Sequence, residues 1–352
     1  MAGERVGGVR TPVVIGAVVI ALVIGLALGV LLGPDGDTPQ LEPAPEPSTT
    51  TPSTLTEPPS PAEAPPGCTE EAFAQADGVP HVVLSRVDGF VDALGGAVLT
   101  GDAPLLFTTS GGLHADVAAE IDRLMPDGGT VYMLGGIDAL TEAIEADLTD
   151  AGHATVRLAG PTRVETALAV ADAAVRLFGE PDTVALARAD VWADAITGGG
   201  WAAKTGQPVL VTQTDRLHPA VAEWLDARPD LTATALGGPT ALSDDVVDQA
   251  DAVRVAGPNR YGTAVAIAGT WPVEPAGFVI GNGDADLAWG YALIGAGLAA
   301  DLDQPVLLVE SDRLPGETDD ATCGGGERAA TTVVGPEALV AQSVRDQLES
   351  TC

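Results

Sequence analysis

The sequence predicts an α/β fold of three tandem parallel-sheet repeats, preceded by one transmembrane helix and a disordered stalk. Short apolar runs alternate with helical segments, which is typical of parallel strands covered on both faces. Related motifs return in one order at intervals of about 100 residues. A long uncharged run comes before all of them.

The uncharged run over residues 12–33 is the expected membrane anchor. Residues 13–32 are all apolar or glycine, and as a helix they would span the roughly 30 Å hydrocarbon core. Arg5 and Arg10 precede the run, so the positive-inside rule places residues 1–11 in the cytoplasm and the remainder outside the cell. A signal peptide cut near residues 27–29 is the alternative. Because a secretory apolar core usually has 7–15 residues, we expect an uncleaved signal-anchor.

Residues 34–66 read as an extracellular stalk. They hold eleven prolines among Ser, Thr, Ala and Glu. Proline removes the backbone donor and fixes φ, so the segment should be extended and semi-rigid, with a reach on the order of 100 Å. We therefore expect a cell-membrane protein whose folded part stands in the cell wall.

The charge balance excludes several functions. Fifty acidic residues against sixteen basic ones give a net charge of −34, and Lys204 is the single lysine. Such a surface repels phosphate backbones, so nucleic acid is not an expected partner. No calcium-loop spacing, CxxC pair or Cys/His cluster occurs, and we expect neither a metal nor a cofactor.

Three sets of motifs define the repeats. Pro104–Thr108 recurs as Pro208–Thr212 and Pro305–Val309, and Leu134–Gly136 recurs as Leu236–Gly238. The block at residues 156–163 returns at residues 253–260. The predicted repeats cover residues 80–181, 182–276 and 277–352.

The first repeat shows the expected order of elements. Strands are predicted at residues 82–85, 105–108, 131–134 and 155–158. Helices are predicted at residues 91–100, 114–125, 140–151 and 163–177. Thr162 and Glu165 have the spacing of a capping box at the start of the last helix.

These blocks resemble the cell wall-binding repeat type 2 (CWB2) modules in surface proteins of Gram-positive, actinobacterial-like bacteria. The family motifs A-R-x-D-x-x-x-D-A, P-[IVL]-L-L-T, L-G-G and A-G-x-x-R-x-x-T-A stand here at residues 187–195, 208–212, 236–238 and 256–264. The resemblance covers about residues 80–352. It implies three α/β modules in a pseudo-threefold arrangement, which bind an anionic cell-wall polymer non-covalently and without catalysis by the repeats.

The third repeat departs from this pattern. Asn282 stands where the second repeat has Arg188, and Tyr291 stands where it has Asp194. The third repeat also ends without the A-G-x-x-R block, and the first has none ahead of it. A binding role is therefore expected mainly from the first two repeats.

Arginines at predicted helix starts are the first ligand candidates. Arg163 and Arg260 each open a helix, with Thr166 and Thr263 three residues later. An arginine fork beside helix N–H groups suits a carboxylate or phosphate. Alternatively, each arginine pairs with an aspartate of a neighbouring repeat and holds the assembly together.

Carboxylates form the second set of candidates. Asp88 and Asp92 follow Arg86, and Asp190 and Asp194 follow Arg188. A spacing of four places each pair on one helix face, where it could serve a glycosidase or internal salt bridges. A repeated pair argues against one active site, and no catalytic motif occurs, so we expect no enzyme.

The three cysteines predict one disulfide. Cys323 and Cys352 both lie in the divergent third repeat, where we expect the Asp- and Gly-rich residues 318–327 to replace an amphipathic helix. A staple there would add roughly 3–4 kcal/mol. Cys68 at the stalk junction is the alternative partner, through a ring of repeats that brings the chain ends together.

The sequence therefore favours a membrane-anchored wall-binding protein. The alternatives are an extracellular solute- or sugar-binding receptor and, less favoured, a wall hydrolase.

Overall fold

The computed structural model describes residues 78–324 and 326–352. The expected anchor, the stalk and Cys68 lie outside this part. Within the described ranges, no helix combines the length and apolarity needed to cross a membrane.

The first sheet is parallel throughout and has the strand order β2-β1-β3-β4. Its strands are β1 (His81–Arg86), β2 (Leu105–Thr108), β3 (Thr130–Leu134) and β4 (Ala154–Leu158). All four predicted strands are confirmed to within one residue at each end. Three of them are runs of mostly buried residues, as expected for strands covered on both faces, whereas β4 at the end of the strand order has only Leu158 buried.

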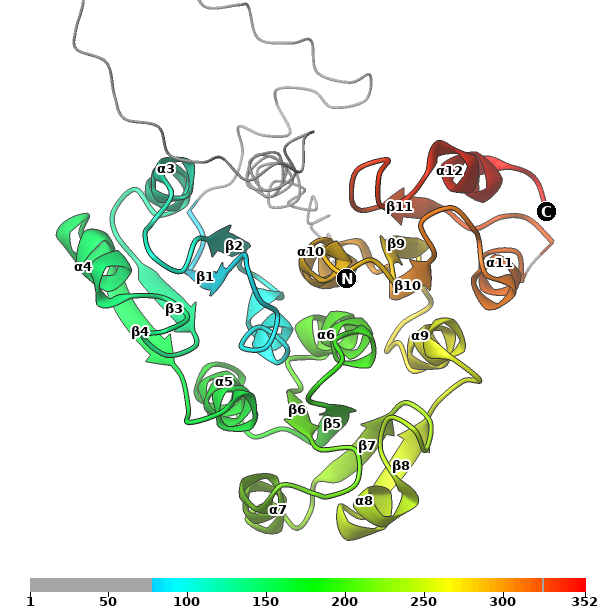
Figure 1. Cartoon of the computed structure of the whole chain (residues 1–352), viewed down its shortest axis with the longest axis horizontal. Helices are drawn as coiled ribbons and strands as arrows, with labels where there is room; N and C mark the ends of the chain where they lie inside the picture. Colours follow the sequence, from blue (N-terminus) through cyan, green and yellow to red (C-terminus); the bar gives the residue numbers. More distant parts are fainter. Residues whose placement is uncertain (1–77, 325) are drawn as a thin grey trace, which may run out of the picture.

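The second sheet repeats this order as β6-β5-β7-β8, whereas the third has only three strands, β10-β9-β11. The second sheet comprises β5 (Thr183–Arg188), β6 (Val209–Thr212), β7 (Thr232–Leu236) and β8 (Ala252–Val255). The third comprises β9 (Phe278–Asn282), β10 (Val306–Val309) and β11 (Thr331–Val333). The three sheets lie around a common centre (Figure 1).

That centre is formed by one helical segment from each unit: η1 (Gly96–Thr100), α6 (Ala193–Thr205) and α10 (Ala288–Leu302). Small residues let these segments approach closely. A Cβ on Gly199 of α6 would lie 2.8 Å from the Cβ of Ala97 and 3.6 Å from that of Ala296. Nearly every residue of α6 and α10 is buried.

The predicted helix at residues 91–100 is wrong in its first half. Turns occupy residues 91–95, and only the 3-10 segment η1 follows. Glycine disfavours a continued helix, and Gly95 and Gly96 lie where the turns end and the 3-10 segment begins. A Cβ on Gly96 would lie 2.5 Å from Leu134 Cδ1, so a larger residue there would have to displace that side chain.

A second set of helices joins the units. α5 (Arg163–Phe178) follows the first sheet and packs against β6 of the second, and α9 (Arg260–Ala268) follows the second sheet and packs against β10 of the third. We call these the junction helices, and we call the segments β1–α5, β5–α9 and β9–α12 the first, second and third units.

The outer helices complete each unit. They are α3 (Ala115–Leu124), α4 (Glu142–Asp150), α7 (Pro219–Asp226), α8 (Asp244–Gln249), α11 (Gly316–Thr322) and α12 (Gln342–Glu349). The expectation that residues 318–327 replace a helix is wrong, because α11 forms there. Buried Thr318 anchors it by donating to the Leu308 carbonyl of β10 at 2.6 Å.

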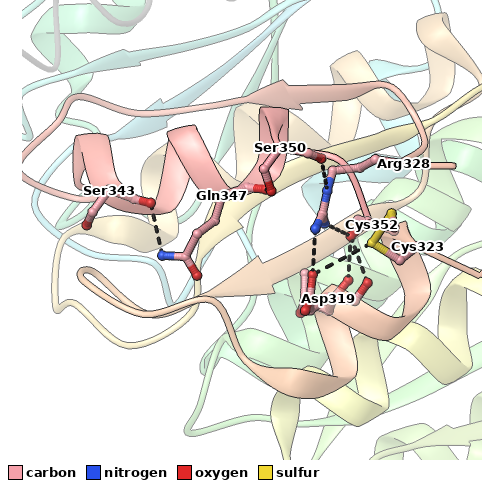
Figure 2. Close-up of polar contacts among 9 residues, drawn as sticks. Asp319, Cys323, Arg328, Ser343, Gln347, Ser350 and Cys352 are labelled. Atoms are coloured by element: carbon pink, nitrogen blue, oxygen red, sulfur yellow. Dashed lines mark hydrogen bonds and ion pairs between the residues drawn. A yellow bond between two sulfur atoms is a disulfide. The ribbon is translucent and has the colours of Figure 1, made fainter. Parts of the chain in front are cut away.

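The predicted disulfide between Cys323 and Cys352 is confirmed, with the two Cα atoms 5.7 Å apart. It joins the end of α11 to the segment that follows α12 (Figure 2). Arg328 reinforces the link by donating to Asp319 at 2.8 Å and to the Ser350 carbonyl at 3.0 Å.

Candidate functional site

The candidate residues gather at the carboxyl ends of the parallel strands, the edge where α/β sheets usually bind ligands. Arg86 ends β1 and Arg188 ends β5. We call Arg86, Asp88 and Asp92, and likewise Arg188, Asp190 and Asp194, the carboxyl-end clusters of the first and second units.

In the first unit the cluster is loosely bonded. The Arg86 Nε lies 3.8 Å from Asp88 and 4.0 Å from Asp92. This buried nitrogen has no hydrogen-bond partner in the described chain. Asp88 instead accepts from the Ser110 hydroxyl at 3.0 Å. The Arg86 side chain as a whole is about a quarter exposed.

The second unit repeats this arrangement. Arg188 lies 3.7 Å from Asp190 and donates over 3.4 Å to the Thr240 carbonyl. Asp194 is 9% exposed. Burial raises the pKa of this carboxyl, and the guanidinium groups of Arg188 and Arg260 oppose the rise.

The expected helix face shared by each aspartate pair is absent. Asp194 lies in α6, but Asp190 lies in the preceding loop, and Asp88 and Asp92 lie in bends and turns before η1. The parallel-strand edge brings them together, whereas the prediction relied on helical spacing. A paired acid and base on one helix is therefore excluded.

Asn282 replaces the arginine in the third unit and turns inward. Its amide is 1% exposed and donates to Ser311 Oγ at 2.9 Å and to the Leu339 carbonyl at 2.7 Å. Its oxygen accepts from the backbone N–H groups of Asp284 and Ala285. The donors and the acceptor of the Asn282 amide are therefore all hydrogen-bonded within the fold.

Tyr291 takes the place of the aspartate. Asp92, Asp194 and Tyr291 each lie against a glycine with positive φ at a strand end, namely Gly135, Gly237 and Gly335. Burial raises the pKa of Tyr291. The third unit therefore keeps the geometry of this position but carries no charge there.

The first junction helix contacts both units that it joins. Arg163 Nη1 donates to the Ala189 carbonyl of the second unit at 2.9 Å. Thr166, 1% exposed, donates to Asp92 of the first unit at 3.3 Å and accepts from the Gly160 N–H. The predicted capping box between Thr162 and Glu165 is present.

The second junction helix repeats these contacts. Arg260 donates to the Gly283 carbonyl of the third unit and pairs with Asp284 at 3.3 Å. Thr263 is buried and accepts from the Gly257 N–H at 3.2 Å. Tyr261 donates to Asp284, and burial together with this bond raises its pKa.

Three arginines with structural roles were not among the residues predicted from the sequence. Arg157 and Arg254 project from β4 and β8 to the carbonyls of Gly135 and Gly237, at 3.1 and 2.7 Å. Within residues 278–324 and 326–352 the third sheet has three strands, and Arg345 of α12 donates to the Gly335 carbonyl at 2.6 Å. The recurrence of Arg157 as Arg254 in the repeated block was the signal available.

Among residues 78–324 and 326–352, no group of three or more His, Cys, Asp or Glu side chains is placed to hold a metal ion. The site thus consists of arginines and carboxylates at strand ends, repeated in two units. Arginines and carboxylates at repeated strand ends are groups that can form hydrogen bonds and ion pairs with a ligand, and the fold that carries them is a repeat-built α/β module.

The chain belongs to the cell wall binding domain 2 (CWB2) family, whose model matches residues 157–247 and 254–345. Each match begins in the last strand of one sheet and ends in an outer helix of the next unit. The family repeat therefore includes the junction helix that precedes its sheet.

Individual relatives are more distant. The chain is 25% identical over 235 residues to the N-acetylmuramoyl-L-alanine amidase LytC of Bacillus subtilis, covering 66% of this chain and 46% of that protein. It is 27% identical over 240 residues to the amidase enhancer of the same organism, covering 66% and 32%. The chain thus spans less than half the length of either relative.

Two solved structures share the fold. Cwp6 and Cwp8 from Clostridium difficile each match with a TM-score of 0.68, at 21% and 22% identity. Both matches cover 78% of this chain, with 44% of Cwp6 and 48% of Cwp8. The three-unit α/β architecture is therefore common to all three proteins.

Proposed function

We propose that the chain holds an anionic polymer of the cell wall non-covalently at the carboxyl-end clusters of its first two units. The observation that carries this proposal is the incomplete bonding of Arg86 and Arg188. Their contacts run from 3.4 to 4.0 Å, beyond the usual 2.7–3.2 Å for N–H···O bonds. Donors therefore remain for a phosphate or carboxylate.

The junction arginines have a mainly structural role in this proposal. Arg163 and Arg260 each donate to a carbonyl of the following unit, so they hold the junctions and flank the ligand. Replacing both with alanine should weaken wall binding and also loosen the assembly. Thr166 and Thr263 are buried and act by positioning the helix start.

The net charge of −34 sets the conditions for binding. An anionic polymer meets a repulsive far field, which salt screens over about 8 Å at physiological ionic strength. The arginines act at shorter range than this. We therefore expect retention on the wall to fall as the salt concentration rises, because salt screens the arginine contacts.

For localisation, we infer a single-pass anchor over residues 12–33, with residues 1–11 cytoplasmic and the folded part in the wall. The uncharged run and its flanking charges support this inference. Protease added to intact cells should remove the folded part and leave a short membrane-embedded stub. A mature N-terminus near residue 30 in the culture medium would contradict the anchor.

We further propose that the chain binds its polymer without cleaving it. Sedimentation of the full chain with purified wall sacculi tests this. The expected result is co-sedimentation without soluble fragments. Release of fragments would identify a hydrolase, and failure to sediment together with stoichiometric binding of a small sugar or other solute would identify a receptor.

A further inference from the structure

A pocket of about 160 Å³ lies between the outer helices α3 and α4 of the first unit. These two helices are neighbours at the periphery of the molecule (Figure 1). The walls are apolar and consist of Leu113, Ala118, Ile121, Leu148 and Ala151. The polar lining consists of Asp122, Asp147 and His153. This pocket is separate from the carboxyl-end clusters.

The pocket carries negative charge. His153 contacts Asp122 through Nε2 at 3.0 Å, and its Nδ1 is buried with no partner in the described chain. The pocket lining thus combines two acidic side chains with a buried imidazole that keeps one nitrogen without a partner in the described chain.

No cation balances these carboxylates from the pocket lining, which contains neither arginine nor lysine. Arg123 lies next to Asp122 on α3 but pairs with Glu120, Nε to Oε2 at 2.7 Å. The pocket is therefore complementary to a ligand that has an apolar stem and a positive end.

Size limits that ligand. A cavity of roughly 150 Å³ takes up benzene, which has six heavy atoms, whereas pockets for whole small molecules have about 300–1,000 Å³. A sugar ring with its substituents is too large. Four methylene carbons and one nitrogen match both the volume and the five apolar side chains of the wall.

We propose that this pocket binds a primary ammonium group on a four-carbon chain, as in a lysine-like side chain carried by the wall polymer. The source on the wall rests on the proposed function, whereas the ammonium chemistry rests on the pocket alone. Such a contact gives this acidic chain an attractive interaction with the wall beside the arginine contacts.

The third unit has a different link at the position that matches Asp122. Cys323 follows the first residue of α11 by the same seven positions that separate Asp122 from the first residue of α3. There, the disulfide to Cys352 joins the outer helix to the segment after α12. In the first unit the pair of His153 and Asp122 makes the equivalent link without a covalent bond.

Nuclear magnetic resonance of the four histidine rings in the full chain tests the pocket, with n-butylammonium as the probe. The ring signals of His153 should shift saturably, with a dissociation constant of roughly 1 mM for a five-atom ligand. Equal concentrations of 1-butanol should give little shift. Asp147→Asn should weaken binding about fivefold, whereas Asp150→Asn, which lies outside the pocket on the same helix, should not.

Several outcomes would overturn the pocket. These are an unchanged His153 signal at saturating probe, equal shifts with 1-butanol, and equal weakening by both asparagine variants. Ala118→Leu, which fills the pocket, should abolish the shift, and an unaltered shift in that variant would also overturn the proposal. Parallel sedimentation with sacculi separates the two proposals: a chain that sediments but ignores butylammonium refutes the pocket alone.

Discussion

The second and third units have the same architecture, but they use polar residues in opposite ways at the carboxyl ends of their strands. Arg188 and Asp194 keep charges at the edge of the second sheet, whereas Asn282 and Tyr291 replace them with groups that are neutral and buried. The third unit folds around its three strands without either charge. The charged cluster is therefore not required for the fold, and this favours a role in binding.

The two units also differ in how their outer helices are secured. The third unit has the Cys323–Cys352 disulfide, and it lacks the fourth strand that the second unit has in β8. A covalent link thus accompanies the smaller sheet.

Among these predictions, loss of this disulfide should change the free energy of unfolding the most. Cys352→Ser should lower the free energy of unfolding by about 3–4 kcal/mol, because the bond closes a loop with a sequence separation of 29. Denaturant titration of the full chain measures the change, and reduction of the unaltered chain should reproduce it. An unchanged midpoint in both would mean that the third unit does not depend on the staple.

The second prediction compares Asn282 and Arg188, which occupy equivalent strand ends. Asn282→Ala should cost about 2–3 kcal/mol, because it leaves buried donors and acceptors without partners. Arg188→Ala should cost less than about 1 kcal/mol, because its contacts are long and partly exposed. Equal costs in thermal unfolding would contradict the distinction between a structural and a binding position.

The third prediction concerns Arg254 and Arg345, which donate to equivalent strand-end carbonyls from a strand and from a helix. Arg254→Ala and Arg345→Ala should each cost about 1.5–3 kcal/mol, since each removes a charged donor from a strand-end carbonyl. Chemical denaturation of both variants measures this. A large cost for Arg254 alone would show that α12 does not replace the missing strand.

The smallest effect is a pH dependence in the second unit. Burial raises the pKa of Asp194, so below about pH 4 this group is protonated in both the folded and the unfolded chain. Above that pH, the unfolded chain releases its proton first, and the folded state carries a growing penalty. The free energy of unfolding of Asp194→Asn, relative to the unaltered chain, should therefore rise from pH 4 to pH 7. A decrease over this range would contradict the sign.

Much of the fold could be predicted because apolar periodicity and repeated motifs report burial directly. The strands of the first unit follow from this signal, as does the junction helix at Arg163 with its capping box. The predicted helix at residues 91–100 forms only in its second half, as the 3-10 segment η1, and local helical spacing does not reveal this difference.

The site was harder to predict, because its geometry depends on which strands are neighbours. Sequence spacing put the aspartate pairs on a helix face, whereas the ends of parallel strands bring them together. The inward turn of Asn282 and the replacement of a strand arginine by Arg345 depend on contacts between distant segments. The pairing of Cys323 with Cys352 could be predicted because both cysteines lie in the divergent repeat.

The central claim is that Arg86 and Arg188 bind the wall polymer, and one measurement tests it most directly. The full chain carrying Arg86→Gln and Arg188→Gln is sedimented with purified sacculi over a series of salt concentrations. Its control carries Arg176→Gln, which removes an arginine charge from the last turn of α5, away from the carboxyl ends of the strands. We expect the first variant to lose about tenfold in affinity, with a weaker salt dependence, and the control to bind normally. Equal retention of both variants at every salt concentration would contradict the account.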